Sequence, residues 1–198
     1  MLRITHLVII VLVLSANLAL GQNDAGCQKC IKNVEIVEMD KMIVVGLNTL
    51  VSSDHNLIPL LWKRFMERCS EIAGSEKKQV TLGVSYAMEP MAEDGRYAFF
   101  HLVGYIVDDA KNIPEGMTYK IIPKHKYAKF QHKGKLDGLM KTYNCITVEW
   151  LPASVYEYDN DAGEFEWYDE RFIPDSDDSV MDIYMPIKEK LQEKMKDN

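Results

Sequence analysis

Residues 114–170 read PEGMTYKIIPKHKYAKFQHKGKLDGLMKTYNCITVEWLPASVYEYDNDAGEFEWYDE, and this stretch carries the strongest fold signal in the chain. A β-branched, aromatic run over 119–132 predicts a strand. The following segment, 135–148, predicts a helix, because one apolar stripe recurs at helical spacing through Leu136, Leu139, Met140 and Tyr143. Trp150-Leu-Pro then predicts a stop, since Pro152 cannot continue a helical turn.

The order strand, helix, strand, strand occurs twice along the chain. In the second half the helix is followed by predicted strands at 164–169 and 180–187. In the first half, strands at 34–39 and 42–51 precede a helix that Asn56 can cap and Gly74 can end, and strands at 80–88 and 97–107 follow. Neither half can bury a core alone, so we expect an α+β fold in which the halves share one antiparallel sheet with both helices on one face.

The first residues have the pattern of a secretory signal. A run with almost no polar groups, Leu7 to Leu20, follows a short segment with Arg3 and ends near small residues at Ala19 and Gly21. It is shorter than the roughly 20 residues that span a bilayer. We therefore expect a cleaved signal peptide at 1–21, no stable membrane span after cleavage, and a secreted or periplasmic protein. An uncleaved membrane anchor is the alternative.

Composition and charge narrow the classes of partner. The 198 residues are 47% hydrophobic and 27% charged, as in globular proteins, and the net charge is −7. A chain this acidic, without a basic stripe, is not expected to bind nucleic acid through phosphate contacts. Its negative surface favours cations instead.

Four cysteines, an even number, are compatible with disulfides in an exported chain. Three pairings are open among Cys27, Cys30, Cys69 and Cys145. The first two have the spacing of a redox or metal motif, but no second pair at ligand spacing follows. We expect a structural linker at 22–33, with no metal and no cofactor.

Several short motifs in the second half resemble those of gyrase-inhibitor-like (GyrI-like), or AraC-type effector-binding, domains, which include integron-encoded drug-binding proteins. The matching segments, in order, are Ile113 to Met117, Ile122-Pro123, Tyr127 to Phe130, His132 to Gly134, Leu139 to Tyr143, Trp150 to Ser154, Phe165 to Tyr168 and Ile183 to Ile187. The first half is compatible with the family but less diagnostic.

This resemblance implies tandem βαββ units related by pseudo-twofold symmetry, with a cleft for apolar, often cationic ligands. It implies an effector-binding domain at 34–187, with halves at 34–107 and 117–187 and a charged tail at 188–198. The family's glutamate in the penultimate strand falls on Glu166. No helix-turn-helix segment precedes the domain, so a regulator's function is not carried over.

Strand alternation divides the residues around Glu166 between two faces. It places Glu166 and Tyr168 on one face and Phe165 and Trp167 on the other. If the second pair packs under the helices, the first lines a ligand cleft on the opposite face, with Glu164 nearer to solvent. Further wall candidates, for which ordinary core packing is an equal alternative, are Trp150, Tyr86, Tyr97 and Tyr105.

The sequence thus predicts an exported small-molecule-binding protein that takes apolar, cationic ligands against Glu166. The alternative is a hydrolase of strained, cyclopropane-type molecules that uses Glu166 and a tyrosine such as Tyr168, which the resemblance also allows. No nucleophile elbow, Ser/His/Asp arrangement or phosphate-binding glycine loop is present, which favours binding over catalysis. A protein partner is a third possibility, without a residue that supports it.

Overall fold

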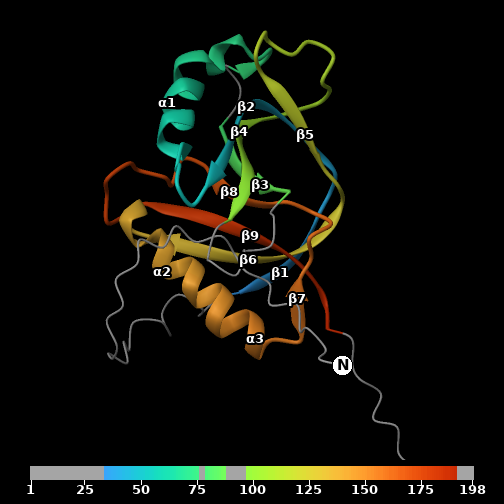
Figure 1. The fold of residues 1–198 in the computed structure, drawn as a ribbon, viewed down its shortest axis with the longest axis vertical. Helices are drawn as coiled ribbons and strands as arrows, with labels where there is room; N and C mark the ends of the chain where they lie inside the picture. Colours follow the sequence, from blue (N-terminus) through green and yellow to red (C-terminus); the bar gives the residue numbers. More distant parts are fainter. Residues whose placement is uncertain (1–33, 76–78, 88–96, 191–198) are drawn as a thin grey trace, which may run out of the picture.

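A computed structural model describes residues 34–75, 79–87 and 97–190 (Figure 1). Within these ranges the first half comprises β1 (Glu35–Met39), β2 (Met42–Ser52), α1 (Ile58–Arg68), β3 (Thr81–Tyr86) and β4 (Ala98–Val107). The second half comprises β5 (Thr118–Ile122), β6 (His125–Lys133), α2 (Leu139–Asn144), α3 (Leu151–Ala153), β7 (Tyr156–Tyr158), β8 (Glu164–Tyr168) and β9 (Val180–Glu189). The expected signal peptide, the whole expected linker and most of the charged tail lie outside the described residues.

The nine described strands form one antiparallel sheet in the order β1-β6-β9-β8-β3-β4-β2-β5, with β7 paired to β9. The predicted α+β class is confirmed. At the centre of this order, β3 of the first half pairs with β8 of the second. Reading outwards from this pair, β3, β4 and β2 mirror β8, β9 and β6, which is the strand order that tandem βαββ units with pseudo-twofold symmetry require.

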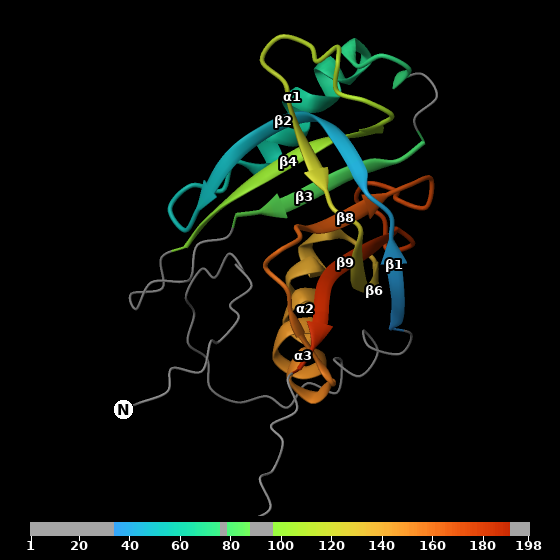
Figure 2. The same cartoon turned by 90° about the vertical axis from the view of Figure 1, so that its right-hand side faces the viewer.

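Two short links curl the sheet. Only residues 40 and 41 separate β1 from β2, although the two strands lie near opposite ends of the order. Residues 123 and 124 separate β5 from β6 in the same way. Figure 2 shows β1 running on into β2 along the outside of the curled sheet. The two ends of the sheet are therefore brought close together.

The face inside this curl is filled by the protein's own side chains. One apolar cluster there includes Leu82, Leu102, Tyr127, Phe165 and Tyr184, which come from five different strands. Phe165 is fully buried and stacks on Tyr184 with ring centroids 4.5 Å apart. The expectation that Phe165 is a core residue is confirmed, but the core that it joins is the one inside the curl.

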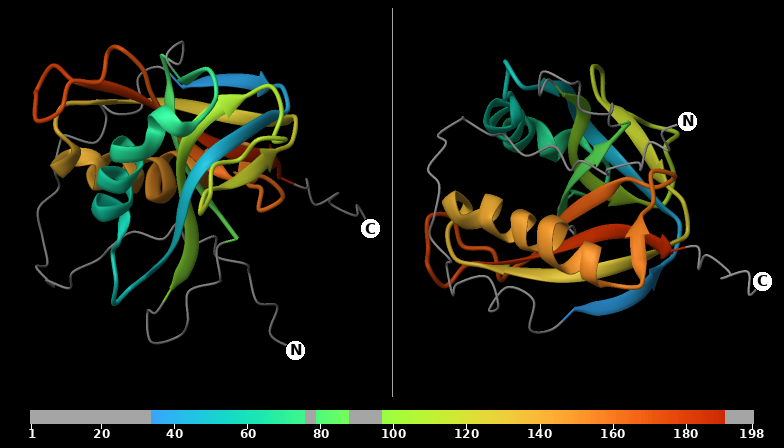
Figure 3. Two further views of the ribbon diagram at one scale, coloured as in Figure 1. Left: turned by 90° about the horizontal axis from the view of Figure 1, so that it is seen from above. Right: turned by 60° about the horizontal axis from the view of Figure 1, so that its bottom comes forward.

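The helices cover the other face of the sheet, one over each half (Figure 3). Leu61 and Phe65 of α1 are buried and pack against Val103 and Tyr105 of β4. The expected cap, Asn56, lies one residue before the observed N-cap, Leu57, which makes no side-chain capping hydrogen bond; Asn56 Oδ1 accepts instead from the amide of Ile58, the first residue of the helix. Residues of α2 and α3 pack against β6 and β9 in a separate cluster.

The second helical segment is longer than the sequence predicts. Instead of ending at 148, it passes from α2 through a wider π-helical stretch, Cys145–Trp150, into α3. Pro152 therefore lies inside the last turn, and the Ser154 amide closes that turn by donating to the Trp150 carbonyl at 2.9 Å. The stop comes at Ser154, whose backbone is extended.

Two further strand predictions need correction. The single strand expected at 119–132 is two strands, because Pro123, which cannot donate a ladder hydrogen bond, interrupts it. The short strand β7 was not predicted. No helix in the described ranges has the length and apolar character needed to cross a membrane.

Candidate functional site

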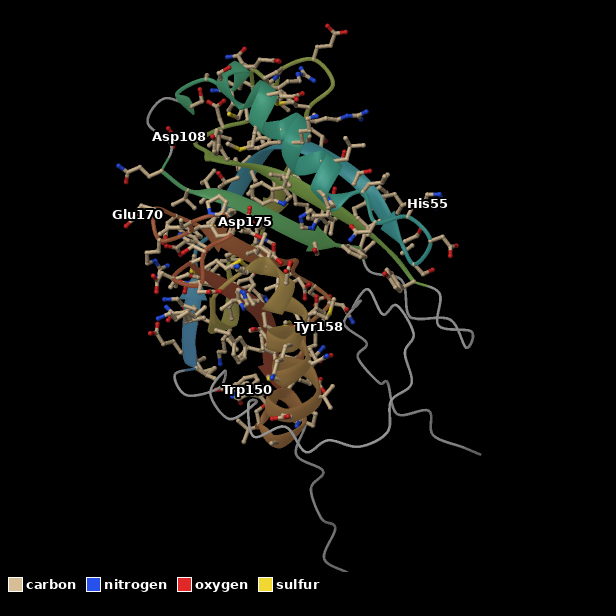
Figure 4. All side chains as sticks on the ribbon, turned by 90° about the vertical axis from the view of Figure 1, so that its left-hand side faces the viewer. His55, Asp108, Trp150, Tyr158, Glu170 and Asp175 are labelled. Atoms are coloured by element: carbon tan, nitrogen blue, oxygen red, sulfur yellow. The ribbon has the colours of Figure 1, made fainter. Side chains whose placement is uncertain are left out.

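The central pair of strands, β3 and β8, places two acidic residues of β8 opposite two small residues of β3. Glu166 lies across from Gly83, and Glu164 lies across from Ser85. Because side chains alternate along a strand, all four belong to the same face of the sheet. Figure 4, viewed from the helix side, shows β3 and β8 between α1 above and the α2–α3 segment below.

The carboxylate of Glu166 is held by two tyrosine hydroxyls. Tyr143 of α2 donates to Glu166 Oε1 at 3.0 Å, and Tyr168 donates to Glu166 Oε2 at 2.7 Å. Since Tyr143 belongs to a helix, Glu166 and Tyr168 face the helices. The expectation that this pair lies on the side of the sheet away from the helices is wrong, because the apolar cluster inside the curl occupies that side and Phe165 points into it.

Burial and hydrogen bonding have opposite effects on the pKa of Glu166. Burial raises the pKa of its carboxyl above the usual range, while the hydrogen bonds from Tyr168 and Tyr143 act to lower it. Burial also raises the pKa values of both tyrosines, helped by the nearby carboxylate, so both hydroxyls keep their protons and act as donors. Glu166 itself is only partly buried. The carboxylate is thus fixed in place by two neutral donors and has no cation beside it in the described residues.

Aromatic rings connect this carboxylate to both helices. The ring of Tyr168 makes an edge contact with Trp62 of α1, with centroids 4.7 Å apart. On its other side Tyr168 contacts Phe172 at 4.8 Å, again edge to face. Trp62 is only partly buried. Trp62 and Tyr143 were not among the predicted site residues, although both lie on the apolar stripes of the predicted helices.

Glu164 is buried, with an exposed fraction of 5%, so the expectation that it is the more solvent-facing acid is wrong. Burial, with a smaller contribution from the charge of Glu166, raises the pKa of Glu164 to about 8. Its Oε2 atom is buried without a hydrogen-bond partner in the described structure. At neutral pH Glu164 is therefore largely protonated.

A buried histidine that the sequence did not point to lies beside this pair. His101 of β4 is opposite Ser85, and its Nδ1 shares a hydrogen bond with Ser85 Oγ at 2.9 Å. Its other ring nitrogen, Nε2, is buried and has no hydrogen-bond partner among the described residues. Burial lowers the pKa of His101 to about 4, so the imidazole is neutral at pH 7.

Two of the predicted wall residues lie away from Glu166. Trp150 packs edge-on against Phe130 and stacks with Tyr156, near the end of the second helical segment that is remote from α1 (Figure 4). Tyr86 stacks on Phe100, and alternation from Gly83 places it on the opposite face of the sheet. Trp150 thus packs against the core, whereas Tyr86 is partly exposed, with Lys120 Nζ 4.6 Å from its ring centroid and Asn48 Nδ2 donating to its hydroxyl.

The other two predicted wall residues share the helix-side face with Glu166. Tyr105 is buried against Phe65 of α1, with centroids 5.2 Å apart. Tyr97 is buried with Phe99 in a small cluster next to the start of α1. Neither has a hydrogen bond to Glu166 among those of the described residues. They pack between the sheet and α1.

The cysteines are only partly described. Cys69 is a free, partly buried thiol that donates weakly to the Met66 carbonyl at 3.6 Å, so its expected participation in a disulfide is wrong. Cys145 is buried in the π-helical stretch. Cys27 and Cys30 lie outside the described residues, and the pairing therefore stays a prediction.

A separate open pocket of about 480 Å³ lies away from this site and has charged walls, with Glu38, Lys124, His125 and Asp159 among them. Glu166 does not line it. Within the described ranges, three or more acidic, His or Cys side chains do not gather in a way that would hold a metal ion. Glu166 with its two tyrosine donors is the candidate site, because it joins a carboxylate to aromatic side chains of both helical segments and of β8.

Comparison with known proteins identifies relatives of the whole domain. Residues 32–188 match the GyrI-like small molecule binding domain. The chain is 34% identical over 157 residues to the transcriptional regulator BrlR of Pseudomonas aeruginosa, in an alignment that covers 78% of this chain and 55% of the regulator. The chain thus spans about half the length of that regulator.

Two solved structures share the fold at low sequence identity. One is SAV2435 bound to tetraphenylphosphonium, with a TM-score of 0.60, 15% identity, and coverage of 79% of this chain and 94% of that chain. The other is a hydrolase from Listeria innocua, with a TM-score of 0.51, 8% identity, and coverage of 79% and 92%. The family model matches residues 32–188, which is most of the chain, and the alignment with the regulator covers 78% of it: the protein belongs to the GyrI-like small molecule binding domain family.

Proposed function

We propose that the protein binds apolar organic cations at the helix side of the β3–β8 pair, with Glu166 as the counter-charge. The observation that carries this proposal is the carboxylate of Glu166, which is fixed by the hydroxyls of Tyr143 and Tyr168 and has no cationic partner in the described residues. The binding of tetraphenylphosphonium by SAV2435, which has the same fold, agrees with this ligand class.

The physical reason is the cost of a partly buried charge. A carboxylate that loses water without gaining a cation is destabilised, and this is why burial raises the pKa of Glu166. An organic cation supplies the missing charge without a tightly held hydration shell of its own. The faces of Trp62 and the tyrosines can each add about 0.5–2 kcal/mol of cation–π attraction, and apolar burial supplies the rest.

Calorimetric titration of the purified protein with tetraphenylphosphonium tests this proposal. Triphenylphosphine oxide serves as a neutral analogue of similar shape. We expect Glu166→Gln to weaken binding of the cation by about tenfold or more, because the cation loses its charged partner. The affinity for the neutral analogue should stay nearly unchanged. Glu149→Gln, at an exposed position of the second helical segment, is the matched control. Equal affinity of the cation for wild type and Glu166→Gln would refute the counter-charge.

Hydrolysis of strained small molecules is the second candidate. It is favoured by the 2.7 Å contact between the Tyr168 hydroxyl and Glu166, a base next to a group that can position water. Incubation with a cyclopropane-bearing electrophile, followed by mass spectrometry, should then show a water adduct that disappears in Glu166→Gln. Unchanged substrate across a panel of such compounds would leave binding as the function.

We also propose that the protein is exported and that the signal peptide ends at residue 21. The support is the apolar run at 7–20 and the small residues that follow it. N-terminal sequencing of the protein produced in a host with a secretion pathway should give Gln22 as the first residue. A protein that keeps Met1 and sediments with membranes would instead indicate an uncleaved anchor.

A further inference from the structure

We propose that binding of a cation at Glu166 releases a proton from the neighbouring Glu164, so that the protein holds organic cations more tightly as the pH rises. This inference rests on the proposed function, because it concerns how binding at that same site is regulated. It requires no space beside Glu164, since the cation acts on this residue through its charge. Its basis is the placement of two carboxyl groups on one face of the central strand pair.

The two acids are neighbours on β8. One residue separates Glu164 from Glu166, and the two lie opposite Ser85 and Gly83 of β3. Side chains two positions apart on a strand leave the same face of the sheet about 7 Å from each other. A positive charge beside Glu166 therefore lies within roughly 10 Å of Glu164, a distance over which charges interact appreciably inside a protein.

The other described ionisable groups that face Glu164 are neutral at pH 7. Tyr143 of α2 and Tyr158 of β7 lie close enough for the charge of Glu164 to act on them, and burial raises the pKa of each, so both keep their protons. His101 of β4, one strand further across the same face, is neutral because burial lowers its pKa to about 4. Among the described residues, the charge that acts on Glu164 is that of Glu166.

These surroundings make Glu164 retain its proton. Its exposed fraction is 5%, its Oε2 is without a hydrogen-bond partner in the part of the chain that the structure describes, and its pKa is raised to about 8. A cation bound to Glu166 opposes this rise, because it attracts the ionised form of Glu164. At an effective dielectric constant of about 20, a unit charge at about 10 Å lowers the pKa of Glu164 by about one, to about 7.

Cation binding and proton release are then linked. The protein with a bound cation loses the Glu164 proton at a lower pH than the free protein does. At pH 7.5 each bound cation should therefore release about half a proton from the protein. By the same linkage, the affinity for the cation should rise about tenfold between pH 6 and pH 9.

Calorimetric titration with tetraphenylphosphonium measures both effects, because this cation has no proton of its own to gain or lose. Titrations at pH 7.5 in phosphate and in HEPES, which differ in their enthalpies of protonation, give the number of protons released. We expect about half a proton for the wild type, together with the roughly tenfold rise in affinity from pH 6 to pH 9. Glu164→Gln, which resembles the protonated acid, should bind the cation with a nearly constant affinity and release no proton.

Two controls isolate the role of Glu164 and of the charge. Glu149→Gln, at an exposed position, should keep the proton release and the pH dependence of the wild type. The neutral analogue triphenylphosphine oxide should release no proton from the wild type, and this comparison needs no substitution.

The outcomes separate this inference from the proposed function. Equal heats of binding in the two buffers for the wild type would overturn the coupling, as would a proton release that persists undiminished in Glu164→Gln. If the cation binds in a Glu166-dependent manner without releasing a proton, the coupling fails and the proposed function stands. If the cation does not bind at all, both fail.

Discussion

Replacing the buried Glu164 with glutamine should change how the stability of the protein depends on pH. The pKa of this carboxyl is raised from 4.5 to about 8 by burial and by Glu166. Between these values the folded protein keeps a proton that the unfolded chain has released. The contribution of Glu164 to stability is therefore fully present below about pH 4.5 and is lost as the pH rises through 8, with a slope of about 1.4 kcal/mol per pH unit.

His101 acts in the opposite direction over a lower range. Burial lowers its pKa from 6.5 to about 4, so between these values the unfolded chain binds a proton that the folded protein does not. Stability then rises with pH by about the same slope, again roughly 1.4 kcal/mol per unit. From about pH 4.5 to 6.5 the two effects nearly cancel, and above 6.5 the decline due to Glu164 is no longer offset by His101. Over the interval from 6.5 to 8 this amounts to about 2 kcal/mol.

Urea unfolding followed by circular dichroism at half-unit steps from pH 5.5 to 8.5 measures this effect. The free energy of unfolding of the wild type should fall by about 2 kcal/mol between pH 6.5 and 8, whereas that of Glu164→Gln should stay nearly level there. Glu149→Gln, which alters an exposed carboxylate, should follow the wild type. Parallel curves for the wild type and Glu164→Gln across this interval would refute the buried, protonated state of Glu164.

Three other predictions concern the scaffold. Phe65→Ala should lower the free energy of unfolding by about 3–5 kcal/mol, because Phe65 is fully buried between α1 and β4; a urea titration that showed a loss below 1 kcal/mol would contradict this packing. Gly46→Ala should prevent folding or cost several kcal/mol of stability, since its Cβ would lie 2.6 Å from the Gly104 Cα and even closer to the Val103 carbonyl. Thermal melts measure this loss, and Gly138→Ala, the control, should have a mild effect in them. Cys69 should be alkylated by a maleimide in the denatured protein without prior reduction, as mass mapping would show; a Cys69 peptide found only after reduction would disprove the free thiol.

The spacing of apolar residues along the sequence was sufficient to predict the fold class and most strands, because each element depends on the pattern of its own residues. The two helices also follow from their apolar stripes, but the end of the second does not. Pro152 carries a strong local stop signal, and the π-helical stretch that lets the helix continue past it depends on packing against β6 and β9. The break at Pro123 could have been predicted from the same rule that was applied to Pro152.

The candidate site was predictable only in part. The resemblance to a family located Glu166, and alternation correctly paired it with Tyr168, but alternation alone cannot tell which face the helices cover. The same period of two placed Glu164 beside Glu166, and this could have indicated a shared environment for the two acids. His101 could not be found in this way, because its position depends on the register of β3 against β4 and β8, which is a long-range property.

The central pairing of β3 with β8 has a consequence for how the two halves assemble. Trp62 comes from the first half, and Glu166 and Tyr168 from the second, so a molecule bound beside all three would bridge the two. The halves are also joined where β1 pairs with β6 and where β2 pairs with β5. If the chain were cut in the connector between β4 and β5, the fragments could still associate through three strand pairings, β1 with β6, β2 with β5 and β3 with β8. A ligand bound at the β3–β8 pair would stabilise this association. The fraction of fragments that reassociate would then increase with ligand concentration and would report how much of the site is occupied.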